Sequence, residues 1–83
     1  MSKQRFYHQA IETKYIAPGN VRGSRIKATA EAGSVTLHWA HNLDAQENHR
    51  RAAEALRDKV GWEGELIGGS LKKSYVWIFA EIK

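Results

Sequence analysis

The stretch SYVWIF, residues 74–79, carries apolar side chains on both sides of any strand that it forms. A half-buried strand alternates apolar with polar residues, so a strand of this kind needs cover on two sides or leaves apolar side chains exposed. What else the chain can lay over residues 74–79 therefore decides which surface is available for function. Alternation gives one face Tyr75, Trp77 and Phe79, and gives the other face Val76, Ile78 and Ala80.

Four other runs read as strands. Residues 7–16 alternate over their whole length, and the break APGNVRGS at 17–24 follows them. Residues 25–30 and 35–39 alternate on either side of a Gly33-Ser34 pair, which is typical of a β-hairpin. Residues 62–69 form a shorter run, and the lysine-bearing loop GGSLKKS separates it from the last strand.

One helix, residues 45–60, is marked at both ends. Asp44 is a favourable N-cap, and Glu47 three residues later completes a capping box. Gly61 suits the left-handed position after the last turn, with Trp62 placed to pack back. The apolar stripe at helical spacing contains Ala45, His49, Ala52, Ala53, Leu56 and Val60.

The order strand–strand–strand–helix–strand–strand predicts an α+β domain, with one antiparallel sheet of about five strands and the helix packed on one face. Eighty-three residues make a single domain, 1–83, of which residues 1–6 are expected to be flexible. One helix covers one face of such a sheet. We expect it to lie over the face that carries Val76 and Ile78.

The opposite face would then be aromatic and basic, and no further element remains to bury it. It would contain Arg25, Lys27, Thr36, His38, Tyr75, Trp77 and Phe79. Exposed rings can stack on nucleic-acid bases, and neighbouring cations can contact phosphates. The net charge of +4, from 13 Lys and Arg against 9 Asp and Glu, favours anionic partners mildly.

The preferred hypothesis is a non-enzymatic nucleic-acid-binding module. Its predicted site is Arg22, Arg25, Lys27, His38, Tyr75 and Trp77. Two alternatives stay open. The same face can bind a protein partner or a second copy of the chain, because interface cores are enriched in aromatic residues and arginine. The rings can also be core, covered by the N-terminal strand or by the Pro18-Gly19 loop.

Other chemistry has little support in the sequence. There is no cysteine, so disulfides and thiolate sites are excluded, and the composition suits a reducing cytoplasm. His38, His41 and His49 do not fall in a metal-binding motif, and no serine lies in a nucleophile elbow. We therefore expect no catalytic residue, metal or cofactor. The first residues lack an apolar signal segment, and no run approaches the ~20 apolar residues of a membrane span.

The phrases TKYIAPGNVRGSRIKA, NHRRAAEAL and SYVWIF together resemble small accessory proteins of unassigned function carried by phages and plasmids. The resemblance covers most of the chain and brings no functional residues with it. It implies a role in contacts with host proteins or DNA more readily than a role in metabolism.

Overall fold

The computed structural model describes residues 10–80. Residues 1–9, which include the segment expected to be flexible and the start of the first expected strand, lie outside the described residues, as do 81–83. Residues 10–80 form β1 (Ile11–Ile16), β2 (Arg25–Ala30), β3 (Gly33–His38), α1 (Ala45–Val60), β4 (Leu66–Ser70) and β5 (Tyr75–Phe79). The predicted α+β fold and element order are confirmed.

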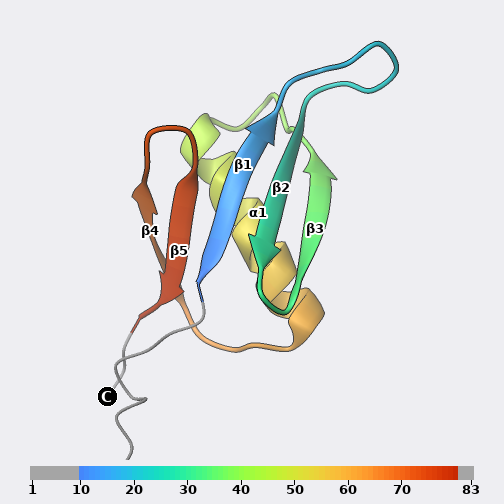
Figure 1. Cartoon of the computed structure of the whole chain (residues 1–83). Coiled ribbons are helices and arrows are strands. Elements are labelled where there is room, and N and C mark those ends of the chain that lie inside the picture. The colour runs from blue at the N-terminus through green and yellow to red at the C-terminus, as the bar shows by residue number, and fades with distance from the viewer. Residues whose placement is uncertain (1–9, 81–83) are drawn as a thin grey trace, which may run out of the picture.

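The five strands form one antiparallel sheet in the order β3-β2-β1-β5-β4, and α1 lies across one face of it (Figure 1). β1 is the central strand. Ile11 pairs with Trp77 on β5, and Tyr15 pairs with Ile26 on β2. The hairpin between β2 and β3 turns at residues 31–32, two residues before the predicted position, and Gly33 already pairs with Ala30.

α1 begins and ends where its capping residues predict. The Asp44 carboxylate accepts a hydrogen bond from the Glu47 backbone N–H at 2.8 Å. Gly61 takes the left-handed conformation with φ of 83°, and the Trp62 N–H donates to the Arg57 carbonyl at 3.0 Å. Toward the sheet, α1 buries Asn48, His49, Ala52, Ala53 and Leu56.

No helix in the described region is long and apolar enough to cross a membrane.

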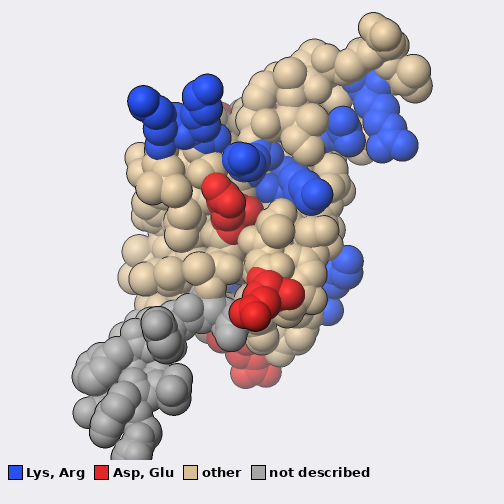
Figure 2. Space-filling view, in the orientation of Figure 1, with Lys and Arg blue, Asp and Glu red and all other residues tan. Residues whose placement is uncertain are grey.

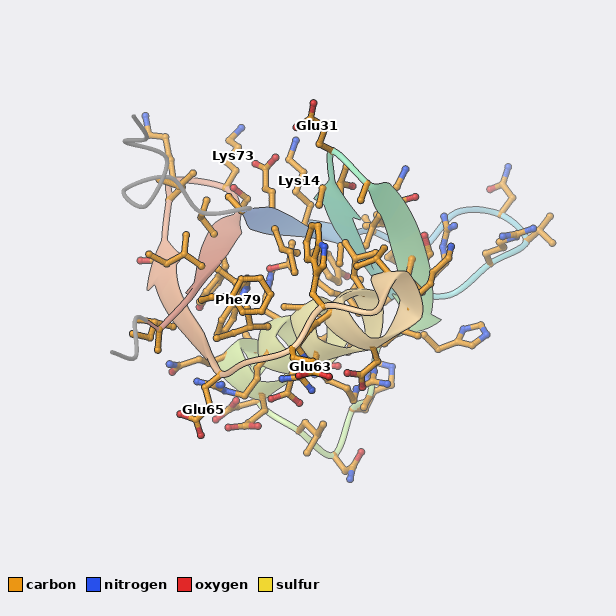
Figure 3. The ribbon with its side chains drawn as sticks, turned by 90° about the horizontal axis from the view of Figure 1, so that it is seen from below. Lys14, Glu31, Glu63, Glu65, Lys73 and Phe79 are labelled. Atoms are coloured by element: carbon orange, nitrogen blue, oxygen red, sulfur yellow. The ribbon has the colours of Figure 1, made fainter. Side chains whose placement is uncertain are left out.

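The predicted facing of the last strand was wrong. Trp77 is 1% exposed and lies in the core between the sheet and α1, whereas Ile78 on the opposite face is 40% exposed. Figure 3 shows Phe79 pointing into the same interior, while Lys14 points away from the helix. The aromatic strand is therefore core, but the helix covers it, rather than the N-terminal strand or the Pro18-Gly19 loop.

Volume and hydrogen bonding explain this choice of face. The buried alanines of α1, Ala52 and Ala53, bring small side chains to the sheet and leave space for a large ring. An indole fills that space and removes more apolar surface from water than valine or isoleucine would. Its N–H also needs an acceptor when buried, and Thr13 on β1 supplies one at 3.0 Å.

β4 is shaped around the same indole. A Cβ on Gly68 would overlap the Trp77 ring, so this position accepts glycine alone without a shift of the ring. Gly69 is different, since a Cβ there would meet nothing within 4 Å. β4 also begins only at Leu66, so residues 62–65 of the run expected at 62–69, which include Glu63 and Glu65, precede the strand.

The pair of glycines gives a matched test of the core. We expect Gly68→Ala to lower the free energy of unfolding by about 1–3 kcal/mol, because the new methyl group forces the buried indole to move. Gly69→Ala, the same change one residue on, should alter stability by less than about 0.5 kcal/mol. Urea denaturation followed by tryptophan fluorescence measures both. Equal effects of the two substitutions would contradict this position of Trp77.

Candidate functional site

The open face of the sheet, which α1 does not cover, carries two lysines at directly paired positions. Lys14 on β1 pairs with Lys27 on β2. Arg25, the neighbour of Lys27 on the same face of β2, pairs with His38 on β3. Like charges placed directly opposite each other destabilise a sheet, so the pairing of Lys14 with Lys27 lowers the stability of the sheet.

The loop between β4 and β5 extends the charge across the sheet. Thr13 pairs with Tyr75, so the loop that ends at Ser74 lies beside Lys14 and carries Lys72 and Lys73. Figure 3 shows Lys73 and Lys14 on the same side of the sheet, directed away from α1. We name the five Lys and Arg residues of this set, together with the adjoining His38, the cationic band: Lys14, Arg25, Lys27, Lys72, Lys73 and His38.

The cationic band lies toward one end of the open face. Figure 2 shows the Lys and Arg side chains gathered over the upper half of this face, with Asp and Glu nearer its centre and lower end. Glu12, the nearest carboxylate on β1, accepts a hydrogen bond from the Ser74 hydroxyl at 2.8 Å. The band therefore presents a positive potential that Glu12 neutralises only in part.

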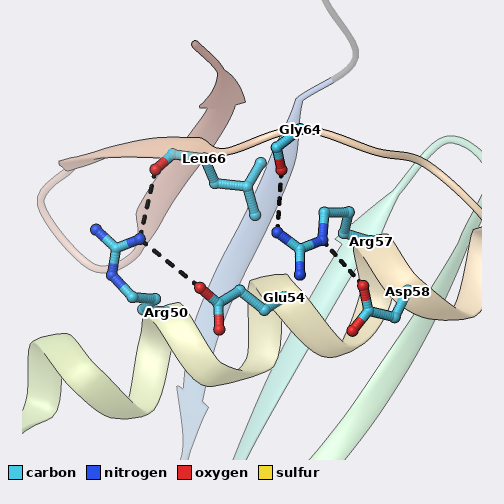
Figure 4. Close-up of polar contacts among 6 residues, drawn as sticks. All are labelled: Arg50, Glu54, Arg57, Asp58, Gly64 and Leu66. Carbon is cyan, nitrogen blue, oxygen red and sulfur yellow. Dashed lines mark hydrogen bonds and ion pairs between the residues drawn. The ribbon is translucent and has the colours of Figure 1, made fainter.

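The ion pairs of the described residues lie on α1, away from the cationic band. Within residues 10–80 the two ion pairs are Arg50 with Glu54 at 3.8 Å and Arg57 with Asp58 at 3.0 Å, both on α1 (Figure 4). Arg57 also donates to the Gly64 carbonyl at 3.0 Å. These helix cations hold the segment that leads into β4. The lysines of the cationic band form no ion pair with a described residue and are available to an external anion.

The part of the open face over β4 and β5 is apolar. A groove of about 330 Å³ runs between the two strands on this side. Ile67 is 56% exposed and Leu71 is 58% exposed, and Val76 and Ile78 complete the apolar lining. The open face thus has a cationic half, which runs from the β4–β5 loop across β1 and β2 to β3, and an apolar half over β4 and β5.

The predicted site residues separate into two groups. Arg25, Lys27 and His38 lie together on the open face, and Arg22 lies exposed in the adjoining 17–24 loop. Tyr75 and Trp77 were assigned to this face wrongly. Tyr75 points toward α1, where its ring stacks on His49 with centroids 4.1 Å apart, so neither ring is available for bases on the open face.

Sequence reasoning missed three members of the cationic band: Lys14, Lys72 and Lys73. Alternation along residues 7–16 correctly places Lys14 and Thr13 on opposite faces of the strand, but it does not give the order of the strands in the sheet. Only the pairing of β1 with both β2 and β5 shows that Lys14 lies between Lys27 and the lysine loop.

Beneath the sheet, Thr13 joins three elements through buried hydrogen bonds. Its hydroxyl oxygen accepts the Trp77 indole N–H at 3.0 Å and lies 2.7 Å from Nδ1 of His49 on α1. In the neutral imidazole that is protonated on Nε2, Nδ1 accepts the Thr13 hydroxyl proton. Both Thr13 and His49 are buried, so the network ties β1 and β5 to the helix at a point that water does not reach.

Burial shifts the titration of this histidine. Loss of water around the imidazole lowers the pKa of His49 below its ordinary value of about 6.5, and a hydrogen bond to the Thr13 backbone opposes the shift in part. The neutral form therefore fits the folded protein better than the imidazolium does.

A second hollow, of about 310 Å³, lies on the helix side beside β4. Its lining includes Arg50, Gln46, Ser70 and the ring of Trp77. The Arg50 guanidinium lies 5.0 Å from the Trp77 ring centroid and donates to the Leu66 carbonyl at 3.4 Å. Arg50 thus shields the core at this edge, and the hollow is separated by the sheet from the cationic band.

Metal-binding residues do not converge in the described region. Among residues 10–80, no three His, Asp or Glu side chains are close enough to hold a metal ion. Asp44 caps α1, and His49 bonds to Thr13, so two of the candidates have structural partners. The expectation that the protein has no metal or cofactor stays a prediction.

Comparison of the chain with protein-family models, with curated proteins and with solved structures finds no match. The open face and its chemistry therefore carry the functional argument.

Stability should depend on pH through His49. The unfolded chain binds a proton at this histidine more readily than the folded protein does, so stability is complete above about pH 6.5 and falls as the pH drops from there toward the lowered pKa. Urea denaturation at pH 7.5 and 5.5 should show a lower stability at pH 5.5. His49→Gln should reduce this difference, whereas His41→Gln, in an exposed loop, should keep it. A wild-type protein equally stable at both pH values would contradict the assignment.

Proposed function

We propose that the protein is a small, non-enzymatic nucleic-acid-binding module that contacts phosphates through the cationic band. The observation that carries the proposal is the direct pairing of Lys14 with Lys27, flanked by Arg25 and by the lysines of the β4–β5 loop. These cations have no ion-pair partner in the described part of the chain, and clustering them is unfavourable unless an anion binds.

The dimensions of the band suit a polyanion. Neighbouring strands lie about 4.8 Å apart, so the step from β5 through β1 and β2 to β3 spans about 14 Å. One nucleic-acid strand advances about 3.4 Å per nucleotide along a duplex axis, so the band matches roughly four successive phosphates. Arg22, in the exposed loop beyond Arg25, is placed to lengthen this contact.

The mode of binding follows from the position of the rings. With Trp77 in the core and Tyr75 turned toward α1, base stacking on the open face has no platform. Phosphate contacts position a nucleic acid but do not read its sequence. We therefore propose binding that depends strongly on salt and weakly on base composition. The cysteine-free composition fits a cytoplasmic location, and the resemblance to phage- and plasmid-borne accessory proteins fits a role at DNA.

The second candidate function is protein interaction or homodimer formation on the open face. The apolar groove of Ile67, Leu71, Val76 and Ile78 favours it, because this is a contiguous group of exposed apolar side chains on a small chain. The two functions use different halves of the face, so substitutions can separate them.

A salt titration tests the preferred function. Binding of a fluorescent oligonucleotide duplex should weaken steeply with salt, with a slope of about −4 to −5 in log K against log [salt] if five cations contact phosphates. Lys14→Gln and Lys27→Gln should each weaken binding and make the slope shallower by about 1. Lys59→Gln, the same loss of charge on exposed α1, is the matched control and should keep the wild-type slope.

Two outcomes would contradict the proposal. One is the absence of binding at low salt. The other is an equal loss of slope in Lys59→Gln and Lys14→Gln, which would assign the effect to net charge rather than to the cationic band. Circular dichroism of each variant confirms that it is folded before its affinity is compared.

A further inference from the structure

Side chains of α1 cover the backbone groups of the two edge strands of the sheet to different extents. An edge strand presents unpaired backbone N–H and C=O groups, which can pair with another strand. In the described region these edges are β3 and β4. α1 closes one of them with cationic side chains and leaves most of the other open.

At the β3 edge, the Trp39 N–H donates to the Ser24 carbonyl at 3.0 Å. Since alternate residues of an antiparallel strand turn their backbone groups to the same side, Ser34, Thr36 and His38 turn theirs outward. The Ser34 carbonyl accepts a bond from Lys59 Nζ at 2.8 Å, and the His38 carbonyl accepts one from Arg51 at 2.6 Å. Two cationic side chains therefore cover this edge.

At the β4 edge, the hydrogen bonds to β5 involve Leu71, whose N–H donates to Ser74 at 2.7 Å, and Glu65, whose carbonyl accepts from Ala80 at 2.8 Å. By the same alternation, the residues that turn their backbone groups outward are Leu66, Gly68 and Ser70. The Leu66 carbonyl receives the 3.4 Å bond from Arg50. The backbone groups of Gly68 and Ser70 on this side have no partner among the described residues.

The composition of β4 leaves its edge open to a strand. Its residues, LIGGS, carry no charge and no proline, the two devices that usually prevent edge pairing. Its flanks are charged and opposite in sign. Glu63 and Glu65 precede the strand, and Lys72 and Lys73 follow it. An antiparallel copy of the same edge would bring the acidic start of one strand to the basic end of the other.

We propose that β4 pairs with β4 of a second copy of this chain, antiparallel and centred on Gly68, to form a continuous sheet across a two-fold axis. Gly68 then faces Gly68 of the second copy, and Leu66 faces Ser70 of the second copy. Each of these residues turns its backbone groups outward, so the register uses groups that β5 does not bind. Of these groups, the Leu66 carbonyl alone has a partner among the described residues, Arg50. The same register places Glu63 opposite Lys73 of the second copy.

Side chains on the open face fit the same register. Ile67 lies opposite Gly69 of the second copy, where the space above the missing Cβ is empty. The exposed side chains of Ile67 and Leu71 then join the apolar grooves of the two copies into one surface. A five-residue strand pairing buries a small interface, so the dimer is weak and its population depends on protein concentration.

Sedimentation velocity of the full chain over a range of concentrations tests the proposal. We expect a monomer–dimer equilibrium that Ser70→Pro abolishes, because proline removes an outward N–H that the monomer does not use. Thr36→Pro, which removes the corresponding outward N–H at the β3 edge, is the matched control and should dimerise as the wild type does. Circular dichroism checks that both variants fold.

A charge exchange tests the register and does not rely on proline. Lys73→Glu places like charges opposite each other twice in the dimer and should weaken it by roughly tenfold. Adding Glu63→Lys to the same chain should restore the wild-type association. Carbodiimide coupling of mixed ¹⁴N and ¹⁵N protein should give an intermolecular amide between Glu63 and Lys73, identified by mass spectrometry.

A chain that stays monomeric at all concentrations would overturn the proposal, as would a dimer that Ser70→Pro and Lys73→Glu leave unchanged. A dimer lost in Thr36→Pro but kept in Ser70→Pro would assign the contact to the other edge and would also overturn it. The test is separate from nucleic-acid binding. Ser70→Pro retains every member of the cationic band, so at protein concentrations low enough for both proteins to be monomeric its salt slope for the duplex should equal that of the wild type.

Discussion

One helix covers one face of a five-stranded sheet, and the buried hydroxyl of Thr13 determines how that face is held. Thr13 lies on the central strand, accepts the Trp77 N–H from β5 and meets His49 of α1. Because an unpaired indole N–H or imidazole nitrogen would be costly in the core, these bonds favour the arrangement with the aromatic face of β5 under the helix. The fit of Trp77 against Gly68 extends the same constraint to the edge of the sheet.

The properties of the outer surface follow from that choice. Once the rings are inside, the open face receives the alternate residues of each strand. These include Lys14 on β1 and Arg25 and Lys27 on β2, and they are apolar on β4 and β5. The cationic half supports phosphate binding and the apolar half supports contact with protein. α1 also covers the two edge strands unequally, because Lys59 and Arg51 bond to β3 while Arg50 bonds only to the start of β4. In the proposed dimer both copies present their open faces on the same side, so two cationic bands would be available to one polyanion.

Much of the fold could be predicted from the sequence, because local patterns specify it. The caps at Asp44 and Gly61, the alternation of β2 and the single helix each report on nearby residues. The facing of β5 could not be predicted in this way. Both of its sides are apolar, so alternation is uninformative, and the choice depends on the space beside Ala52 and Ala53 and on Thr13, distant in the chain. For the site, Arg25, Lys27 and His38 lie on strands whose facing was predicted correctly, whereas Lys14, Lys72 and Lys73 join them only through the strand order.

Hydrogen exchange of the Trp77 indole N–H, followed by NMR, tests the central claim most directly. Substituting phenylalanine for Trp39 and Trp62, which are only partly buried, leaves one indole signal to assign. If Trp77 is enclosed between the sheet and α1 and bonded to Thr13, this proton should exchange only through opening of the core, at a rate close to that of the slowest backbone amides. It should also show an NOE to the Thr13 side chain. Exchange at the rate of a solvent-exposed indole would contradict the account, because the rings would then lie on the open face.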